Sequence, residues 1–343
     1  IKGNLSKMFT YDVRYSYNFE QGLASEDSLF SATGNQLGIY SNQPRQFHNI
    51  DARLNISPVK EFSAQIGYGK NFIGEGYRSL FLSDQASAYP FLKLQTRVWK
   101  LEYTNLFAWH QEPVSNKPNG AMRNKFTSSH YLSYNVFKGF NVSVFETVIW
   151  QAKDTLFNRG YDITYLNPII FFRPLEYAQG SSDNVIIGAA MSYKIKDKYM
   201  LYAQFVLDEF LLKEVKAGNK WWANKFGIQA GFKTYDIAGI KGLGFRTEFN
   251  WVRPFTYAHK NNGQSYSNKL QPLAHPMGAN FMELTNRISY VHNRWQASLD
   301  INYNAKGYDN SDTLTFGGEV NLSYELREGE YGHEMLQGEK VNK

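Results

Sequence analysis

The stretch from residue 9 to residue 20 alternates strictly between apolar and polar side chains. Its odd positions carry Phe, Tyr, Val, Tyr, Tyr and Phe, and its even positions carry Thr, Asp, Arg, Ser, Asn and Glu. Successive side chains of a β-strand point to opposite faces, so this segment predicts a strand with one apolar and one charged face. Strands of globular proteins average about 5–6 residues, whereas a tilted strand needs about 9–11 residues to cross a bilayer. The length of the pattern therefore favours a membrane-crossing strand.

The same long pattern returns along the whole chain. We predict about 14 strands, at 8–20, 48–56, 61–70, 91–96, 98–109, 127–137, 142–150, 185–195, 199–208, 226–235, 243–251, 282–291, 295–304 and 314–327, with room for further hairpins in 35–41, 161–173 or 255–270. Long antiparallel strands in even number predict an all-β fold, a transmembrane β-barrel of the bacterial outer membrane with about 14–18 strands. The alternative is a tyrosine-rich soluble β protein, such as a carbohydrate-active sandwich. We expect residues 1–327 to form the barrel and residues 328–343 to form a polar periplasmic tail.

Composition agrees with a barrel and argues against several other classes. Aromatic residues make up 16% of the chain, which suits the aromatic girdles that flank a lipid-facing band. The mean hydropathy is −0.48, and no run approaches the roughly 20 apolar residues of a transmembrane helix. Cysteine is absent and the seven histidines show no HExxH spacing, so we expect no disulfide, metal site or cofactor. The net charge of +6, without a Lys/Arg run, argues against nucleic acid and favours an acidic partner such as an anionic saccharide or lipid headgroup.

The lengths of the connections orient the predicted barrel. Outer-membrane barrels have short periplasmic turns and longer outside loops, and short and long connections alternate here. Such a barrel is exported through the periplasm, so a chain that opens at Ile1 without a signal peptide is expected to be a mature or truncated form. The long segments contain apolar runs such as Ile169 to Phe172, which we expect to fold inward and close the lumen. The segments expected outside are 21–47, 71–90, 151–184, 209–225 and 253–281.

Several short motifs occur in a characteristic order from residue 76 onward. They are GYRSLFLSD (76–84), SSDN (181–184), YAQFVLDEF (202–210), TYAH (256–259) and LAHPMGANF (273–281). In these motifs the chain resembles the capsule-assembly Wzi family, which implies an outer-membrane barrel lectin that holds capsular polysaccharide to the cell surface. The family barrel has 18 strands preceded by a periplasmic helical segment, whereas we count about 14 strands and no helical segment before Phe9. The aromatic-rich style looks like a Bacteroidetes-type relative, and in that group similar barrels accompany gliding and protein-secretion machinery.

Eight residues in and beside these motifs could form an inward-facing saccharide site. Saccharides stack on aromatic rings and accept hydrogen bonds from charged side chains, and an arginine fork can meet the carboxylate of an acidic sugar. The competing interpretation, which we favour for each residue alone, is that these side chains tie the loops to the barrel wall through buried ion pairs. Tyr257 and His259 would share one face if their segment were extended. The eight candidates are Arg78, Asp84, Asp208, Glu209, Arg253, Tyr257, His259 and His275.

Trp221 and Trp222 form a second feature, in a loop that also carries Lys213, Lys216, Lys220 and Lys225. One interpretation is a surface patch for an anionic glycan or partner. The interpretation we favour is an interfacial aromatic anchor, with the lysines facing lipid headgroups.

Other functions receive less support from the sequence. A barrel enzyme needs a nucleophile and a base at the rim, and Asp208–Glu209 with His259 or His275 could be imagined as such a set, but no GxSxG motif is present. An open pore would suit the charged inward positions Asp12, Arg14, Glu20, Arg246, Glu248, Glu283 and Arg287, but the apolar loops argue against a wide channel. We therefore expect a non-enzymatic barrel in the outer membrane. Its expected partners are membrane lipid, lipopolysaccharide and surface polysaccharide, and the alternative is an accessory barrel bound to other outer-membrane proteins of a secretion, gliding motility or nutrient-uptake complex.

Overall fold

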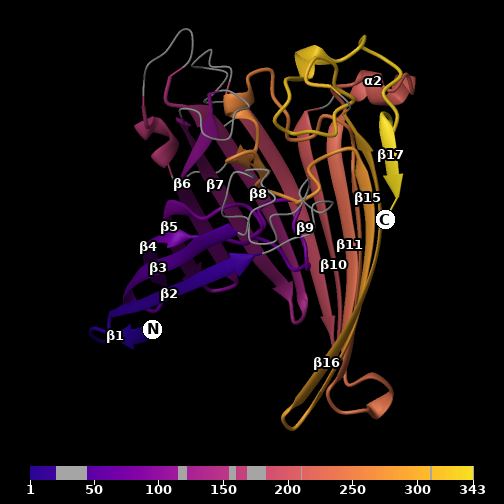
Figure 1. Ribbon diagram of the computed structural model, residues 1–343. Coiled ribbons are helices and arrows are strands. Elements are labelled where there is room, and N and C mark those ends of the chain that lie inside the picture. The colour runs from indigo at the N-terminus through magenta and orange to yellow at the C-terminus, as the bar shows by residue number, and fades with distance from the viewer. Residues whose placement is uncertain are drawn as a thin grey trace.

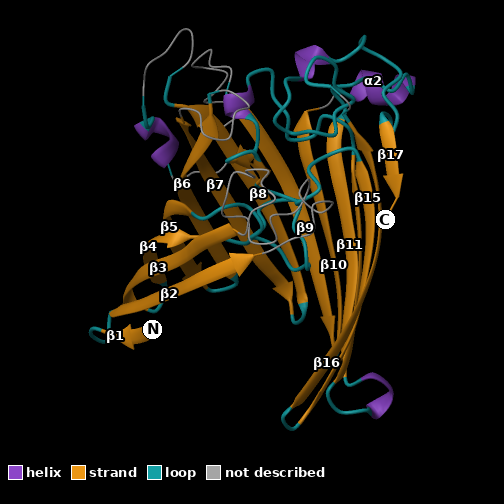
Figure 2. Ribbon diagram, viewed as in Figure 1, coloured by secondary structure: helices purple, strands orange, loops and turns teal. Residues whose placement is uncertain are grey.

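One antiparallel sheet of 15 strands organises the protein, in a computed structural model that describes residues 1–20, 45–114, 122–153, 160–167, 183–209, 211–309 and 311–342 (Figures 1 and 2). Each strand pairs with the next one along the chain, and β1 and β17 are the two edges. The sheet curves into a wall, and the long connections gather at one end of it (Figure 1). The strands are β1 (Lys2–Asn4), β2 (Phe9–Glu20), β3 (Arg45–Val59), β4 (Phe62–Gly69), β5 (Tyr89–Val98), β6 (Leu101–Pro113), β7 (Met122–Phe137), β8 (Phe140–Gln151), β9 (Asn184–Ile195), β10 (Tyr199–Glu209), β11 (Lys225–Tyr235), β12 (Leu243–Val252), β15 (Phe281–His292), β16 (Trp295–Tyr308) and β17 (Glu339–Asn342).

Short elements complete the fold outside the sheet. A hairpin of β13 (Ser267–Asn268) and β14 (Gln271–Pro272) lies within the connection between β12 and β15. The helices are α2 (Leu212–Ala217) and the 3₁₀ turns η1 (Ile163–Leu166), η2 (Ile237–Gly239), η3 (Asn262–Gln264) and η4 (Tyr324–Leu326). Among the helices of the described ranges, none has the length and apolarity needed to cross a membrane.

Thirteen of the fourteen predicted strands are confirmed, with ends that move by a few residues. The predicted strand at 314–327 is wrong. The carboxylate of Asp309 accepts the backbone N–H groups of Phe316 at 2.5 Å and Glu319 at 2.9 Å, which curls the segment into a loop. Gly317 takes a φ of +78°, which an extended strand does not contain. The alternating apolar and polar residues of this segment therefore do not form a strand paired in the sheet.

The end of the chain lies where the long connections gather. The strand β17 pairs with the last residues of β16, from Ala305 to Tyr308. Glu330 accepts a hydrogen bond of 2.7 Å from the indole of Trp222, and Glu334 forms an ion pair with Lys220. Residues 328–342 thus pack on the loops, and not at the end with the short turns, where we expected a periplasmic tail.

Alternate residues of each strand face two different surroundings. On β10, Tyr202, Gln204 and Val206 are almost fully buried, while Tyr199, Leu201 and Phe205, on the opposite face, are 41–49% exposed. Exposed aromatic residues also flank the short turns, as an aromatic girdle at one membrane interface would. They are Trp99, Phe137, Tyr193, Tyr199, Tyr235, Tyr290 and Trp295. The outer face of the wall therefore has the composition of a lipid-facing surface.

The hydrophobic core lies inside the curved sheet. The connection between β4 and β5 (70–88) and the connection between β12 and β15 (253–280) supply much of it, against inward side chains of the wall. Leu80 and Phe81 are completely buried, and Phe81 stacks on Phe145 of β8 with ring centroids 4.8 Å apart. The expectation that outside segments fold inward and close the lumen is confirmed for these two connections. The apolar run from Ile169 to Phe172 and segment 21–44 lie outside the described residues.

Gly188 of β9 makes room for Phe81. A Cβ atom at position 188 would lie 2.3 Å from the Phe81 ring and 3.0 Å from the carbonyl oxygen of Phe205. Any larger residue here must displace the ring, because the backbone oxygen on the other side cannot give way. The neighbouring residue, Ala189, points to the outer face and is exposed.

We predict that Gly188→Val displaces the Phe81 ring and loosens the connection between β4 and β5, whereas Ala189→Val does neither. Displacing a fully buried phenylalanine costs about 3 kcal/mol or more, so the Gly188 variant should melt earlier in detergent. It should also conduct ions more readily in planar bilayers than the wild type does. Equal conductance and equal melting for the two variants would contradict this role of Phe81.

Candidate functional site

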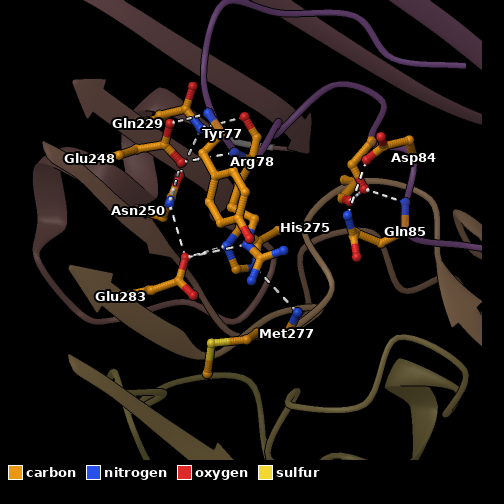
Figure 3. A network of polar contacts seen from close by, with 12 residues as sticks. Tyr77, Arg78, Asp84, Gln85, Gln229, Glu248, Asn250, His275, Met277 and Glu283 are labelled. Atoms are coloured by element: carbon orange, nitrogen blue, oxygen red, sulfur yellow. Dashed lines mark hydrogen bonds and ion pairs between the residues drawn. The ribbon is translucent and has the colours of Figure 1, made fainter. Parts of the chain in front are cut away.

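Glu248 of β12 anchors the connection between β4 and β5 to the inner wall. Its Oε2 atom accepts the backbone N–H of Tyr77 and the hydroxyl of Tyr202, both at 2.7 Å. Its Oε1 atom accepts the backbone N–H of Arg78 at 3.0 Å and the amide of Asn250 at 3.0 Å. The carboxylate is fully buried, and a buried charge is tolerated when hydrogen bonds replace its hydration. These four donors do so, and Figure 3 shows Glu248 with Tyr77, Arg78 and Asn250.

The network continues from Glu248 across the neighbouring strands. Gln229 of β11 donates to the carbonyl oxygen of Arg78 at 3.1 Å and to Asn250 at 2.8 Å. Asn250 in turn donates to Glu283 of β15 at 3.2 Å. His275 Nε2 lies 2.8 Å from the same carboxylate, and Arg78 Nε lies 3.9 Å from it. Two candidates from the sequence, Arg78 and His275, therefore meet at Glu283 (Figure 3).

Tyr77 lies among three guanidinium groups. The ring centroid is 4.4 Å from the Cζ atom of Arg246, 4.6 Å from that of Arg78 and 5.7 Å from that of Arg287. Cations over an aromatic face are attracted by its quadrupole. Arg287 also forms a two-fold hydrogen bond with Asp300, at 2.5 and 2.7 Å. The ring of Tyr77 therefore brings three positive charges together beside the first connection.

A second cluster surrounds Lys225 at the start of β11. Its Nζ atom lies 3.4 Å from Asp208 and 3.2 Å from Glu209, and it donates to the carbonyl oxygen of Ala258 at 3.2 Å. Asp208 accepts the backbone N–H of Tyr257 at 2.7 Å. The hydroxyl of Tyr257 reaches the carbonyl oxygen of Leu80 at 2.8 Å. This cluster thus fixes the connection between β12 and β15 to the wall and to the first connection.

The two inward connections also bind each other directly. The N–H of Ser83 donates to the carbonyl oxygen of Leu273 at 2.8 Å. Ser87 donates to the side chain of Gln271 at 2.8 Å, and the side chain of Asn268 donates to the carbonyl oxygen of Ser87 at 2.9 Å. The two connections therefore form one interlocked unit inside the curved sheet.

The eight candidate residues lie either in the interior or at the mouth, which is the end of the curved sheet where the long connections gather. Tyr257 and His275 are completely buried and Asp208 is 4% exposed, so their polar atoms serve the internal network. Arg253 donates to the carbonyl oxygen of Asn224 at 2.7 Å, and burial lowers the pKa of its guanidinium. Asp84 is exposed and bonds to Gln85, away from the Glu248 network (Figure 3).

Tyr257 and His259 do not share a face. Phe255 and Tyr257 have φ values of +64° and +73°, so the segment turns instead of extending. Tyr257 points into the core, whereas the His259 ring lies edge-on to Tyr324, with centroids 5.8 Å apart. Burial, with a contribution from Lys225, lowers the pKa of His259 to about 4. Its Nδ1 atom accepts the backbone N–H of Asn261 at 3.2 Å, which requires a neutral ring.

The predicted lipid anchor at Trp221 and Trp222 is wrong for Trp222. This side chain is 8% exposed and packs with Phe255 in a small core. The guanidinium of Arg327 lies 4.0 Å from its ring centroid. Trp222 therefore holds the end of the chain over the mouth, a contact between residues more than 100 positions apart that no local pattern indicates.

The imagined catalytic set is not assembled. Asp208 faces Lys225, while His275 faces Glu283. Within the described part of the chain, no group of three or more His, Cys, Asp or Glu side chains could hold a metal ion. The sequence had placed Glu248 and Glu283 on the inner face, which is confirmed. It missed Tyr77, Gln204, Gln229 and Asn250. For the three residues on strands, Gln204, Gln229 and Asn250, a polar side chain at an inward position in mid-strand was a usable signal.

Comparison with known proteins supports the fold. No protein-family model matches the sequence, and no curated protein matches it. The structure is similar to Wzi of Escherichia coli, described as an outer-membrane protein involved in group 1 capsule assembly and a carbohydrate-binding β-barrel. The TM-score is 0.52 at 10% identity, over 87% of this chain and 70% of that one. OccK7 of Pseudomonas aeruginosa (TM-score 0.39, 10% identity, 88% and 84% covered) and OccAB2 of Acinetobacter baumannii (0.41, 10%, 90% and 84%) also match. The chain therefore has the fold of an outer-membrane β-barrel.

We predict that Glu248→Ala releases the first inward connection. The change leaves four donors buried without an acceptor, which costs about 3 kcal/mol or more. Limited trypsin digestion of the detergent-solubilised protein, read by mass spectrometry, should then show cleavage after Arg78. The control is Glu102→Ala, which removes a carboxylate near a short turn that is partly exposed and pairs with Arg97 and Gln95. Resistance of the Glu248 variant at Arg78, equal to that of the wild type, would refute the anchoring role.

We predict that acid loosens the loop that carries His259. The pKa of this side chain is about 4 in the folded protein and about 6.5 in an unfolded chain, so only the unfolded form binds the proton between these values. Its contribution to loop stability is therefore complete above pH 6.5 and falls by up to about 3 kcal/mol as the pH drops to 4. Hydrogen exchange of the Asn261 amide, corrected for intrinsic rates, should show protection lost across this window. His259→Gln should remove the dependence on pH.

Proposed function

We propose that this chain is a non-enzymatic outer-membrane barrel that binds surface or capsular polysaccharide at its outer mouth. In this proposal the end with short turns faces the periplasm, the outer wall contacts lipid and lipopolysaccharide, and the interlocked connections face the cell exterior. Wzi-like attachment of capsule is the specific role we favour.

The observation that carries the proposal is the closed mouth. Two connections that fold inward are tied to the wall through Glu248 and Lys225 and to each other through Ser83 and Ser87. A diffusion pore gains nothing from such bonds, whereas a binding protein needs a rigid platform. The closed mouth therefore supports recognition of a ligand at the surface over passage through the lumen.

The similarity to Wzi supports a carbohydrate as the proposed ligand. That protein is described as carbohydrate-binding and involved in capsule assembly, and its fold matches this chain over most of the length. The motifs that resemble the Wzi family point the same way. The candidate residues then separate by role, in our proposal. Arg78, Asp208, Arg253, Tyr257, His259 and His275 brace the platform, while Asp84 and Glu209 reach solvent.

Binding of the polysaccharide from the protein's own cells tests the proposal. The purified barrel in detergent should bind this extracted polysaccharide saturably in biolayer interferometry, and an unrelated barrel in the same detergent should not. Purification from native membranes, with bound proteins and glycans both identified, addresses the accessory-barrel alternative. A stable set of outer-membrane proteins without any glycan would replace the present proposal with that alternative.

A further inference from the structure

A polar hollow opens at the loop end of the sheet, apart from the Glu248 network. Its volume is about 440 Å³, within the range of pockets that hold small ligands. The tips of β6 and β7 form one side, and the turn that enters η3 forms the other. The residues that line it are Glu112, Pro113, Val114, Arg123, Lys260, Asn261, Asn262 and Gly263.

Buried polar atoms without partners surround this hollow. Glu112 is 3% exposed, and its Oε2 atom receives Lys125 at 2.7 Å and Ser267 at 3.0 Å, while its Oε1 atom has no hydrogen-bond partner. The Oδ1 atom of Asn262 is also buried without a partner. Buried polar groups are nearly always hydrogen-bonded in native proteins. Both residues line the hollow, and a ligand that donates hydrogen bonds would satisfy these two acceptors.

Gln151 adds a donor next to these acceptors. Its Oε1 atom accepts a hydrogen bond of 3.1 Å from Arg123, and its Nε2 atom is buried without a partner. A Cβ atom at position 263 would lie 2.3 Å from this same Oε1 atom, so only glycine lets the turn approach Gln151 so closely. The close approach places the turn residue Asn262 beside the tips of β7 and β8.

The charges at the hollow favour an acidic ligand. The negative charge of Glu112 is matched by Lys125, which is itself 1% exposed. Arg123 and Lys260 then remain as lining cations, and Lys260 has only an exposed, 3.9 Å ion pair with Glu325. An anion without hydroxyl groups, such as chloride or sulfate, would leave the acceptors of Glu112 and Asn262 unmet. A sugar acid satisfies both requirements, because its hydroxyls donate while its carboxylate meets the cations.

We propose that this hollow binds a uronic acid residue of the polysaccharide. Arg123 and Lys260 meet the sugar carboxylate, and Glu112 Oε1 and Asn262 Oδ1 accept sugar hydroxyls. This assignment rests on the proposed function and adds to it the site and the chemical class of the sugar. None of its residues was among the candidates from the sequence.

Matched oligosaccharides test the assignment. Isothermal titration of the full chain in detergent with trigalacturonic acid should show binding at least about tenfold tighter than with maltotriose. Arg123→Gln should weaken the affinity for the uronate at least about tenfold, because it removes the charge and the guanidinium fork that meet the carboxylate. The affinity of Arg123→Lys for the uronate should fall between that of the wild type and that of Arg123→Gln. The control, Arg97→Gln, removes one positive charge at an exposed pair near a short turn and should bind as the wild type does.

The outcomes separate the two proposals. If the wild type binds its own surface polysaccharide but Arg123→Gln binds equally well, the site assignment is overturned and the proposed function stands. If inorganic phosphate competes as strongly as the uronate does, the hollow is an anion site and the sugar assignment is wrong. If no saccharide binds at all, both proposals fail. Heat-dependent gel mobility checks that each variant is folded, and the lysine variant preserves the test if the glutamine variant is not.

Discussion

The buried carboxylate of Glu248 is the interaction on which the closed mouth depends. A charge in a lumen filled by loops loses its hydration, and this loss is compensated only by a full set of hydrogen bonds. Two backbone N–H groups of an inward connection, one tyrosine hydroxyl and one amide supply that set. Because two of the four donors belong to the backbone at Tyr77 and Arg78, the carboxylate fixes the path of the chain as well as a side chain. The packing of Phe81 and the link from Tyr257 to Leu80 follow from that path.

Because side chains alternate along each strand, the sheet presents an apolar outer face and a polar inner face. Outward residues such as Leu201 and Phe205 carry the apolar surface, and inward residues such as Gln204 hold the connections, here through a 2.8 Å bond to the N–H of Leu80. A strand in a membrane must bond its own backbone groups to its neighbours, which leaves only the inward side chains free for this task. The inner polar face therefore acts as a set of docking points for the loops, and not as the lining of an aqueous channel.

The inward connections leave the loop end of the sheet as the place where we propose that a ligand binds. The candidates that the sequence ranked by chemistry, among them Asp208 and His275, proved to be paired inside. Among the polar atoms without partners are those of Glu112, Gln151 and Asn262 beside the hollow, residues without a distinctive motif. Chemical type alone thus identifies polar residues, whereas only the arrangement shows which of their atoms are already satisfied.

The sequence by itself determined the strands, their inward and outward faces and the side on which the long connections lie, because strand alternation and turn length are local properties. It failed at 314–327, where the carboxylate of Asp309 bonds backbone groups 7 to 10 residues ahead and overrides an alternating pattern. Only the tertiary structure decided which loop residues are braces and which atoms stay free at the mouth. Tyr77 meets Glu248 across 171 positions and Ser87 meets Gln271 across 184, and such pairs depend on how the sheet curves in space.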